Sequence, residues 1–428
     1  MNSHYEVNSH CELSHCEFSH YEVIIVGAGM VGASLACALT RAASAGQVVP
    51  SVLLVEAAPI SLDGPPRQPG FDSRSTVLSA SSCDALAGLD LWPALAAHAE
   101  PITQILVSDQ GRFGAVRLSA AEAKVPALGY VAENGALGRA FNQALLRSQR
   151  FILRANTRVR ALKAVPGGMH LSLEGSDEVL SAALVVLADG GRSGLAAQLG
   201  IERRECAYGQ SAIIANIACE LPHAGRAWER FTPKGPLALL PLPDFEGEHR
   251  CALVWTHPAA EAEAVLALPD AAFLARLQAD FGQALGELKK VGKRALFPLS
   301  LTMASEQVRP GLVLLGNVAH TLHPVAGQGF NLALRDALTL AHEVRSALAL
   351  GTSPGDMRQL LRYQESIAVD QDLTIGFSHH LVSLFSSNKP GLGLVRQIGM
   401  AALAHVAPLR QALARQAMGY GQPRVDLE

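Results

Sequence analysis

The stretch LLGNVAHTLHPVAGQGFNLALRD, residues 314–336, decides the fold we expect for this chain. Its apolar start predicts a strand that leads into a loop carrying Pro324, Gly327 and Gly329, and the amphipathic pattern from Asn331 predicts a helix. A loop of this kind directs backbone N–H groups and the positive end of a helix towards an anion. The reduced ring of a flavin carries its negative charge at the pyrimidine end, so a helix N-terminus could stabilise it without a charged side chain.

A second glycine-rich turn, GAGMVG, occupies residues 27–32 near the N-terminus. An apolar run over 21–26 predicts a strand before the turn, residues 30–45 predict a helix after it, and residues 51–56 predict the next strand. This is the element order of the βαβ unit that binds dinucleotides. Two anion-binding loops of this type on one chain predict that the ligand is FAD.

Each residue of the first turn has a defined role in this interpretation. Gly27 permits the tight turn, Gly29 lets a pyrophosphate approach the backbone, and Gly32 lets the helix pack closely on the strand. Glu56 ends the next strand, where a ribose hydroxyl needs an acceptor. The alternative is an ordinary tight turn, but the strand, helix and acidic residue around the glycines favour nucleotide binding.

Chain length and composition indicate a globular protein. The 428 residues, 49% of them hydrophobic and 17% charged, predict two or three domains with large cores. The net charge of -3 provides no basic field, which argues against nucleic acid as a partner. Seven scattered cysteines without a CxxC pair indicate a reducing cytoplasm, without a disulfide framework or a metal site. No Lys or Arg precedes the uncharged run over 23–39, so we interpret it as strand, turn and helix rather than a signal or membrane segment.

The first residues repeat a short motif, as NSHYEV, NSHCEL, SHCEF and SHYEV over residues 2–23. The histidines and cysteines of these repeats could in principle bind a soft metal. Repeat expansion explains the pattern more simply, so residues 1–20 are expected to form a disordered tail without a metal site.

Patterns further along the chain predict an α/β fold in which two layers alternate along the sequence. Strand-like runs over 208–258 predict an antiparallel sheet, 259–288 is expected to be helical, and 388–393 is expected to interrupt the C-terminal helices. We therefore expect a discontinuous, Rossmann-like FAD-binding domain, an interleaved antiparallel-sheet substrate domain and a C-terminal helical region. The predicted extents are 21–80, 129–199 and 301–345 for the first, 81–128 and 200–300 for the second, and 346–428 for the third.

Three motifs together resemble the flavoprotein aromatic hydroxylases, which share the para-hydroxybenzoate hydroxylase fold. They are GAGMVG with Glu56, the sequence ADGGRS over 188–193, and the motif that begins at Gly316. The resemblance covers nearly everything from residue 21 to about residue 350. Within the family, HPVAGQGFNLALRD and the sequence FDSRSTVLS over 71–79 resemble the ubiquinone-biosynthesis hydroxylases, and in particular the 2-octaprenyl-6-methoxyphenol hydroxylase branch.

The resemblance also implies which residues form the site. Catalytic roles beside the flavin are expected for four residues of the second loop, namely His323, Pro324, Gly327 and Gln328. Cofactor-binding roles are expected for a larger set drawn from all the motifs: Gly27, Gly29, Gly32, Glu56, Arg74, Arg139, Asp189, Gly316, Asn317, Gly329 and Asn331.

The chain departs from the family pattern at three positions. Asn317 stands where most relatives carry Asp, but it keeps an acceptor and adds donors, so FAD binding remains expected. Ala333 stands where Gly is usual, and Gly138 stands where Gln is common before the matching Arg139. These departures leave the fine geometry of the site open.

Several of the expected site residues also have a purely structural interpretation. Arg74 could form a surface salt bridge, and Asp189 could simply cap the turn of its own loop. His320 and His323 flank the flavin loop, where a histidine is more often a packing group than a base. The apolar stretch PLALLPLP over 236–243 could be a wall facing the flavin or a proline-bounded edge strand.

By the same resemblance, the expected reaction is hydroxylation of a prenylated phenol in ubiquinone biosynthesis. NAD(P)H reduces FAD, O2 adds to the reduced ring at C4a, and the distal oxygen of the hydroperoxide is transferred to the phenol. GLGLVRQIG over 391–399 lacks the spacing of a second fingerprint and is expected to be a turn between helices. NAD(P)H would therefore bind transiently at the groove that holds FAD.

Two alternatives remain open for the function. A hydroxylase of the same fold could act on a small soluble phenol, or a non-catalytic scaffold could retain FAD within a biosynthetic complex. The expected location is the cytoplasm, with peripheral contact on the inner face of the cytoplasmic membrane, because a prenylated phenol needs access to a bilayer. The expected partners are the phenol, O2 and a ubiquinone-biosynthesis complex, and not nucleic acid.

Overall fold

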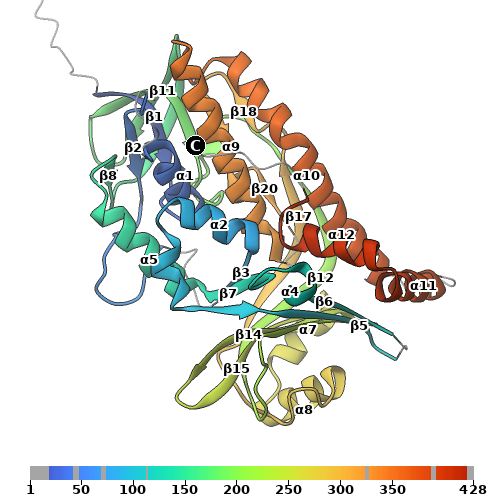
Figure 1. Ribbon diagram of the computed structural model, residues 1–428. Helices are drawn as coiled ribbons and strands as arrows, with labels where there is room; N and C mark the ends of the chain where they lie inside the picture. The colour runs from blue at the N-terminus through green and yellow to red at the C-terminus, as the bar shows by residue number, and fades with distance from the viewer. Residues whose placement is uncertain are drawn as a thin grey trace, which may run out of the picture.

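The computed structural model describes residues 19–41, 48–68, 74–111, 114–322, 327–386 and 392–421. Two large sheets form its frame (Figure 1). A mainly parallel sheet lies in the upper part of the view with helices packed on it, and an antiparallel sheet lies below it. The C-terminal helices run along one side from the first sheet to the second (Figure 1).

The first sheet has eight strands. Its central path runs β18-β19-β11-β1-β2-β8, and the five strands from β19 to β8 are parallel. A meander of β9 and β10 is added through β11. The strands are β1 (Ser19–Val26), β2 (Val52–Val55), β8 (Ile152–Arg154), β9 (Val159–Val165), β10 (Gly168–Leu173), β11 (Val179–Leu187), β18 (Val308–Arg309) and β19 (Leu312–Leu314).

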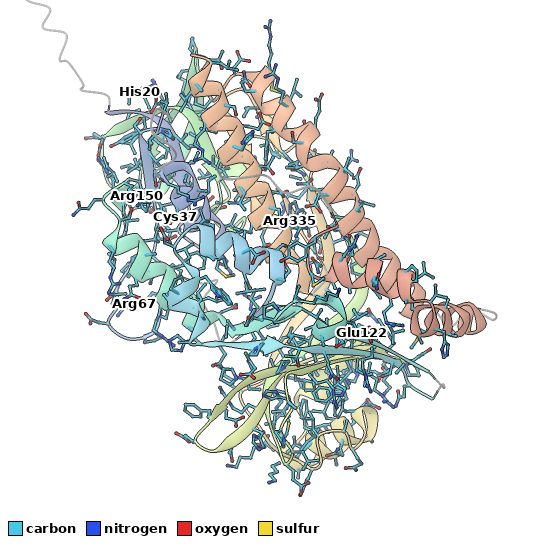
Figure 2. All side chains as sticks on the ribbon, viewed as in Figure 1. His20, Cys37, Arg67, Glu122, Arg150 and Arg335 are labelled. Carbon is cyan, nitrogen blue, oxygen red and sulfur yellow. The ribbon has the colours of Figure 1, made fainter. Side chains whose placement is uncertain are left out.

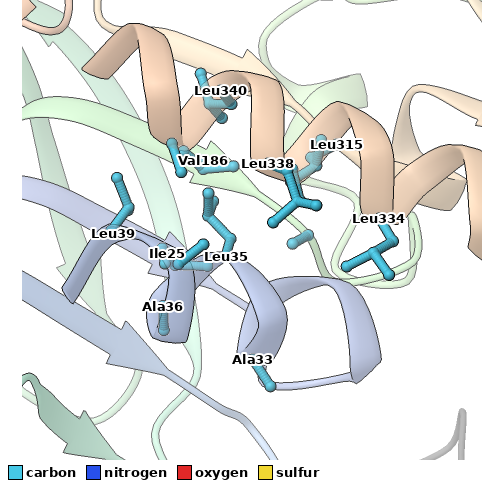
Figure 3. Close-up of a cluster of buried hydrophobic side chains, with 14 of the residues drawn as sticks. Ile25, Ala33, Leu35, Ala36, Leu39, Val186, Leu315, Leu334, Leu338 and Leu340 are labelled. Atoms are coloured by element: carbon cyan, nitrogen blue, oxygen red, sulfur yellow. The ribbon is translucent and has the colours of Figure 1, made fainter. Parts of the chain in front are cut away.

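Helices α1 (Met30–Thr40) and α9 (Gln328–Ala349) pack side by side on this sheet. Leu35 of α1 and Leu338 of α9 share one core cluster with Ile25 of β1, and all three are buried (Figure 3). Each fully buried leucine contributes about 1.5–3 kcal/mol relative to exposure. This packing brings the loop before α9 next to the glycine turn before α1.

The second sheet has nine strands in the order β20-β17-β12-β15-β14-β13-β5-β6, with β16 paired to β12. All neighbours are antiparallel except β13 and β5, which are parallel. Helices α7 (Ala259–Leu266) and α8 (Asp270–Phe281) cover one face. The strands are β5 (Gln104–Asp109), β6 (Ala115–Ser119), β12 (Arg203–Cys219), β13 (Arg226–Thr232), β14 (Gly235–Phe245), β15 (Glu248–Pro258), β16 (Leu288–Val291), β17 (Ala295–Ala304) and β20 (His320–Thr321).

A third, small sheet of three strands lies between the two large ones, in the order β3-β7-β4. Its strands are β3 (Ser75–Ser79), β4 (Ala99–Ile102) and β7 (Gly129–Glu133). The remaining helical segments are α2 (Ala80–Gly88), α3 (Trp92–Ala96), α4 (Ala120–Ala123), α5 (Asn134–Arg147), α6 (Leu195–Gln198), the 3-10 turn η1 (Gly316–Val318), α10 (Met357–Ser386), α11 (Leu392–His405) and α12 (Ala407–Ala417).

Ion pairs join the C-terminal helices to the rest of the fold. Arg335 of α9, labelled in Figure 2, donates from Nη2 to Asp370 Oδ1 of α10 at 3.2 Å. Arg410 of α12 donates to Glu122 of α4 at 3.1 Å, and Glu122 is also labelled there. No helix in the described part of the chain is both long enough and apolar enough to cross a membrane.

The expected α/β class is confirmed, with a Rossmann-like sheet, an interleaved antiparallel sheet and C-terminal helices. The division into domains remains a proposal. Leu86 of α2 and Leu95 of α3 lie in the core of the first sheet. We therefore propose that the first boundary falls after α3 and not at residue 80.

Three predicted boundaries near the glycine loops were wrong. The first helix was expected over 30–45, but it ends at Thr40, because the backbone of Arg41 is extended (φ −58°, ψ 131°). The predicted tail included His20, yet β1 already begins at Ser19 and pairs with β11 there; residues 1–18 lie outside the described residues. The second loop ends earlier than expected, since α9 starts at Gln328 and not at Asn331.

Two further predictions were wrong away from the loops, and of the two interpretations of PLALLPLP the edge strand is excluded. The segment over 259–288 is not one helical unit, because Pro269 precedes α8 and Gly282, with φ +95°, ends it. Residues 392–399 of GLGLVRQIG belong to helix α11 and do not form a turn. Strand β14, which contains PLALLPLP, is central and not an edge strand, because it pairs with both β13 and β15.

Candidate active site

A cleft of about 660 Å³ opens where the parallel strands of the first sheet end. Val26 of β1, Val55 of β2 and Ala188 after β11 all border it, as does Leu315 after β19. In open α/β sheets, ligands bind outside the carboxyl ends of the strands. The cleft therefore lies where a nucleotide is expected.

The three glycines of the first turn have different surroundings. Gly27 has φ +104°, and a Cβ there would lie 2.7 Å from the Cα of Asp189. A Cβ on Gly32 would lie 1.9 Å from the carbonyl oxygen of Gly27, so close packing of helix on turn requires glycine. Gly29 borders the cleft, and a Cβ there would meet no atom within 4 Å. The space beside Gly29 is thus open for a ligand.

Glu56 is buried and borders the same cleft. Its Oε2 accepts a hydrogen bond from the backbone N–H of Ala28 at 2.6 Å, and its Oε1 accepts one from Ala58 at 2.8 Å. Each carboxylate oxygen has a second lone pair, so the group can still accept hydrogen bonds from ribose hydroxyls. The two backbone contacts fix its orientation towards the glycine turn.

Asp189 organises the loop that follows β11. Its Oδ1 accepts from the backbone N–H of Gly191 at 3.0 Å, and its Oδ2 accepts from that of Ser193 at 2.7 Å. These contacts are those of a residue that caps the turn of its own loop, which is the structural interpretation of Asp189. The residue also borders the cleft.

Arg74 and Phe297 form one wall of the cleft, and the guanidinium carbon of Arg74 lies 4.9 Å from the centre of the Phe297 ring. Ser75 lies beside them, and its shielded Oγ has no hydrogen-bond partner within the described part of the chain. A shielded polar atom without a partner is costly unless a ligand or water pairs with it. This wall is therefore suited to a polar ligand.

The second glycine loop reaches the cleft at the N-terminus of α9. Gly327 caps this 22-residue helix with φ +61°, and a Cβ there would lie 2.7 Å from Cβ of Val77 in β3. No acidic side chain occupies the first turn. The positive end of the helix therefore faces the cleft without a competing carboxylate in the first turn, and it can stabilise an anion there.

Asn331 holds this helix start against β3. Its Nδ2 donates to the carbonyl oxygens of Val77 at 2.9 Å and Gly327 at 2.8 Å, and its Oδ1 accepts from the backbone N–H of Ser79 at 2.9 Å. The amide uses both donor hydrogens and its oxygen on the protein backbone. We therefore interpret Asn331 as a positioning residue for the loop and not as a ligand of the cofactor.

The predicted site residues separate into three groups. Those that border the cleft are Gly27, Gly29, Glu56, Arg74, Asp189, Asn317, Gly327 and Gly329. Those outside it are Gly32, Gly316, Gln328, Asn331 and Arg139, the last being exposed on α5. His323 and Pro324 lie outside the described residues.

His320, the other histidine of this region, is buried and does not border the cleft. Its Nε2 lies 2.9 Å from Oδ2 of the buried Asp336, which also accepts a hydrogen bond from Gln371 of α10 at 2.9 Å. His320 therefore connects the loop to α9 and α10, in agreement with the packing interpretation.

A second, mostly apolar cavity of about 250 Å³ adjoins the cleft. Val77, Leu240, Val254 and Gly327 border both spaces. Pro236, Ala238 and Leu240 of β14 face the second cavity, and Leu240 borders the FAD cleft as well. Helices α11 and α12 cover the cavity. We call this space the apolar cavity.

One ionisable side chain, Glu229 of β13, borders the apolar cavity among the described residues. Burial raises the pKa of Glu229 to about 7. It forms no hydrogen bond or ion pair with the described part of the chain. Sequence reasoning missed it, because a single glutamate in a strand gives no motif signal.

Sequence reasoning also missed Ser75, Asn134 and Phe297, which border the cleft. Asn134 lies at the start of α5 and accepts a hydrogen bond from Thr76 Oγ1 at 2.6 Å. The helical pattern that begins at Ala136 could have identified it, because Asn is common just before the first turn of a helix. Phe297 of β17 comes from a distant strand, and only the folded sheet places it here.

The residues present fit FAD. Four features surround one cleft: open space at Gly29, the fixed carboxylate of Glu56, the Ser75 hydroxyl, which has no partner in the described part of the chain, and the N-terminus of α9. They offer, in turn, room for a pyrophosphate, an acceptor for ribose, a partner for a polar group and a positive end for a reduced ring.

Comparison with known proteins agrees with this geometry. Residues 20–366 match the FAD binding domain family. The ubiquinone hydroxylase UbiL of Rhodospirillum rubrum is 36% identical over 400 residues, which cover 92% of this chain and 89% of that protein. The 3-demethoxyubiquinol 3-hydroxylase of Escherichia coli is 33% identical over 395 residues, covering 92% of this chain and 97% of that protein.

A solved structure shows the same fold at lower identity. The p-nitrophenol 4-monooxygenase of Pseudomonas putida superposes with a TM-score of 0.74 at 17% identity, covering 95% of this chain and all of that one. The similarity in sequence to the two hydroxylases extends over nearly the whole length of each. The chain therefore belongs to the family of FAD-binding monooxygenases that includes the ubiquinone hydroxylases.

Proposed function

We propose that this monooxygenase hydroxylates a polyprenyl phenol, a precursor of ubiquinone, with NAD(P)H and O2 as co-substrates. The observation that carries the proposal is the junction of the FAD cleft with the apolar cavity at Val77, Leu240, Val254 and Gly327. A phenol ring at this junction lies next to the cofactor, and its apolar substituent extends away into the cavity. The names of the two sequence relatives support a ubiquinone precursor as the substrate.

FAD, when bound, supplies the electrons and the activated oxygen for hydroxylation. The protein's own part is binding, orientation and exclusion of water. Glu56 and the turn at Gly29 would hold the nucleotide end, and the N-terminus of α9 would favour negative charge at the ring end. The aliphatic residues of β14 and β15 at the junction keep the reacting end dry.

NAD(P)H is proposed to reach the flavin without a nucleotide-binding fold of its own. A third cleft, of about 560 Å³, shares Asp189 and Ser193 with the FAD cleft and is bordered by Arg203. This shared rim supports transient binding of the nicotinamide cofactor at the groove that holds FAD. Stopped-flow reduction of the bound flavin by NADH and by NADPH tests the step, and no reduction by either would contradict it.

We propose that the new hydroxyl group is added at the ring position that is implied by the resemblance to the 2-octaprenyl-6-methoxyphenol hydroxylase branch. The Escherichia coli relative is named for hydroxylation at a different stage, as a 3-demethoxyubiquinol 3-hydroxylase. NMR of the isolated product distinguishes the two positions directly.

We also propose that the protein works in the cytoplasm and contacts the inner face of the cytoplasmic membrane. Val406 and Leu409 are exposed where α11 meets α12, next to the helices that cover the apolar cavity. Exposed apolar side chains at this place support entry of the substrate from a bilayer. Co-flotation with phospholipid vesicles tests this contact, and its absence with vesicles of every composition tried would contradict it.

The function is tested with purified, FAD-loaded protein and matched phenols. A prenylated 6-methoxyphenol and the same phenol without its prenyl chain are each incubated with NAD(P)H in air, and products are identified by mass spectrometry. We expect a hydroxylated product with the prenylated phenol at a higher kcat/KM. Turnover of soluble phenols alone would show instead that the protein is a hydroxylase of small phenols.

A further inference from the structure

We propose that Glu229 binds the hydroxyl group of the substrate phenol and accepts its proton during hydroxylation. The inference rests on the proposed function, because it requires a phenol in the apolar cavity. It assigns a catalytic role to a residue of β13 that lies outside all the sequence motifs.

The register of the second sheet places Glu229 in line with the FAD cleft. Glu229 is paired with Ala238 of β14, Ala238 with Val254 of β15, and Val254 with Ile214 of β12. Side chains of one such row point to the same face of a sheet. Val254 and Ile214 border the FAD cleft, so the row leads from the carboxylate to the cofactor.

The spacing along this row suits one aromatic ring. Neighbouring strands lie about 4.8 Å apart, so the backbones of Glu229 and Val254, two strands apart, are separated by about 10 Å. A glutamate side chain followed by a phenol ring spans such a gap. The ring then lies between the carboxylate and the wall of the FAD cleft.

The surroundings of Glu229 leave its carboxylate for a ligand. Its neighbours in the row and along β13 are Val107, Ala238, Ala227 and Phe231. Across the cavity, the described residues of α10, α11 and α12 contribute neutral side chains such as Thr374, Met400 and Gln416.

Two other charged groups lie nearby in the register. Asp109, paired with Phe231, is on the same face at the end of β5 but does not border the cavity. Arg230 follows Glu229 in β13, so its side chain projects to the opposite face of the sheet. No nearby charge contributes to the shift in the pKa of Glu229; burial alone raises it.

A second polar atom points to a ligand in the same cavity. Thr256 is fully buried and borders the cavity, and its Oγ1 has no hydrogen-bond partner within the described part of the chain. It lies on β15 two residues after Val254, on the same face of the sheet, and is paired with Ala212 of β12. The cavity thus offers two polar groups without a partner in the described part of the chain, in a wall that is mostly apolar, as expected for a ring with more than one oxygen substituent.

The proton step is balanced within the two partners. The O–H bond of the phenol breaks, a new O–H bond forms on Glu229, and the electron pair stays on the phenolate oxygen. The phenolate donates this electron density into the ring, which makes the carbon atoms ortho and para to it better nucleophiles. The pKa of Glu229 is about 7 and that of a phenol is about 10. The pKa of Glu229 is therefore closer to the pKa of a phenol than the pKa of an ordinary carboxylate is.

The test compares Glu229→Gln with the matched control Glu205→Gln, which changes an exposed carboxylate on β12 of the same sheet. Each FAD-loaded enzyme is assayed with the prenylated phenol for product, for NAD(P)H oxidation and for the pH dependence of kcat. Wild-type kcat is expected to rise with pH through about 7, because the base acts when deprotonated. In Glu229→Gln we expect the rise of kcat with pH to disappear and product formation to fall about 10²–10⁴-fold.

The flavin spectrum of Glu229→Gln is expected to match that of wild type, which shows that the variant is folded and binds FAD. Glu229→Asp, which keeps a carboxylate, is expected to retain the rise of kcat with pH, although kcat itself is lower. Product formation by Glu229→Gln at the wild-type rate and with the wild-type pH profile would overturn the inference.

If wild-type enzyme hydroxylates only soluble phenols, the proposed function fails, and the same comparison with those phenols decides the role of Glu229. If wild type hydroxylates no phenol, both fail.

Discussion

At the scale of single residues, Gly29 and Gly32 separate cofactor binding from folding. In Gly32→Ala, the new methyl group meets the backbone of Gly27, so the unfolding free energy of the apoprotein should fall by about 1–3 kcal/mol or more. In Gly29→Ala, the methyl group enters the open cleft, so stability should change by less than about 0.5 kcal/mol. FAD affinity should nevertheless fall at least ~10-fold in Gly29→Ala, equivalent to about 1.4 kcal/mol.

Urea unfolding of the two apoproteins and fluorescence titration with FAD check these outcomes. Each glycine variant is the control for the other, since the substitution is identical. Equal loss of stability in both variants would contradict the assignment of open space at Gly29.

The raised pKa of Glu229 leads to a second prediction, which concerns the stability of the protein and does not depend on activity. Its folded pKa, about 7, exceeds the ordinary value of 4.5, so between these values the native state binds more protons than the unfolded state. Stability should therefore fall as pH rises through this window and remain lower above it. Above about pH 7, Glu229→Gln should be more stable than wild type by roughly 1–3 kcal/mol, a range that allows for screening by water in the cavity.

Unfolding by urea at about pH 5 and about pH 8 measures this difference. We expect it to shrink at the lower pH, where the wild-type carboxyl is mostly protonated. A difference that does not change with pH would show that burial does not perturb Glu229 in this way.

At the scale of elements, Asn331 couples α9 to β3. Asn331→Asp removes both donors and directs a charged oxygen at the carbonyls of Val77 and Gly327, which should lower the unfolding free energy by roughly 2–4 kcal/mol. The matched change Asn317→Asp falls on an exposed residue and should stay within about 0.5 kcal/mol of wild type. Urea unfolding midpoints check both, and equal effects would contradict the positioning role.

The elements around the first glycine turn could be predicted because local signals agree there. The apolar run of β1, the turn at Gly27 and the acid at Glu56 each indicate the same βαβ unit. Local signals failed where a single residue overrides periodicity. Gly282 ends α8 within a segment that otherwise has a helical pattern, and the helix α9 begins earlier because Gly327 adopts a left-handed backbone against Val77.

The candidate site could be predicted only in part, for a related reason. Residues within motifs, such as Gly29 and Asp189, border the cleft. Arg139, chosen by its place in a resemblance, is exposed on α5, because the rotation of the helix decides which side chains face the cleft. Glu229 and Phe297 belong to strands whose neighbours are distant in sequence, so pairing of the strands, and not any local pattern, places them.

At the scale of the whole molecule, the antiparallel sheet, the small three-stranded sheet and helices α9 to α12 together enclose the apolar cavity. Ala238 lies in its floor, between Glu229 and Val254. Ala238→Phe should fill this space and lower kcat/KM for the prenylated phenol at least ~10-fold. Affinity for FAD should change less than about twofold, because Ala238 does not border the FAD cleft.

Steady-state kinetics and FAD titration check this prediction. The control is Ala207→Phe, which places the same side chain on an exposed residue of β12 and should leave both quantities near wild type. Unchanged turnover of the prenylated phenol by Ala238→Phe would show that the substrate does not occupy the cavity.

The central claim is that two distant glycine loops hold one FAD beside a cavity that receives the phenol, so that oxygen from O2 enters the ring. The most direct measurement is turnover of the prenylated phenol by the purified, FAD-loaded protein with NAD(P)H under ¹⁸O2, followed by mass spectrometry of the product. The account predicts a single ¹⁸O atom in the new hydroxyl group. NAD(P)H oxidation that leaves the phenol unlabelled, with the label found only in hydrogen peroxide or water, would contradict it.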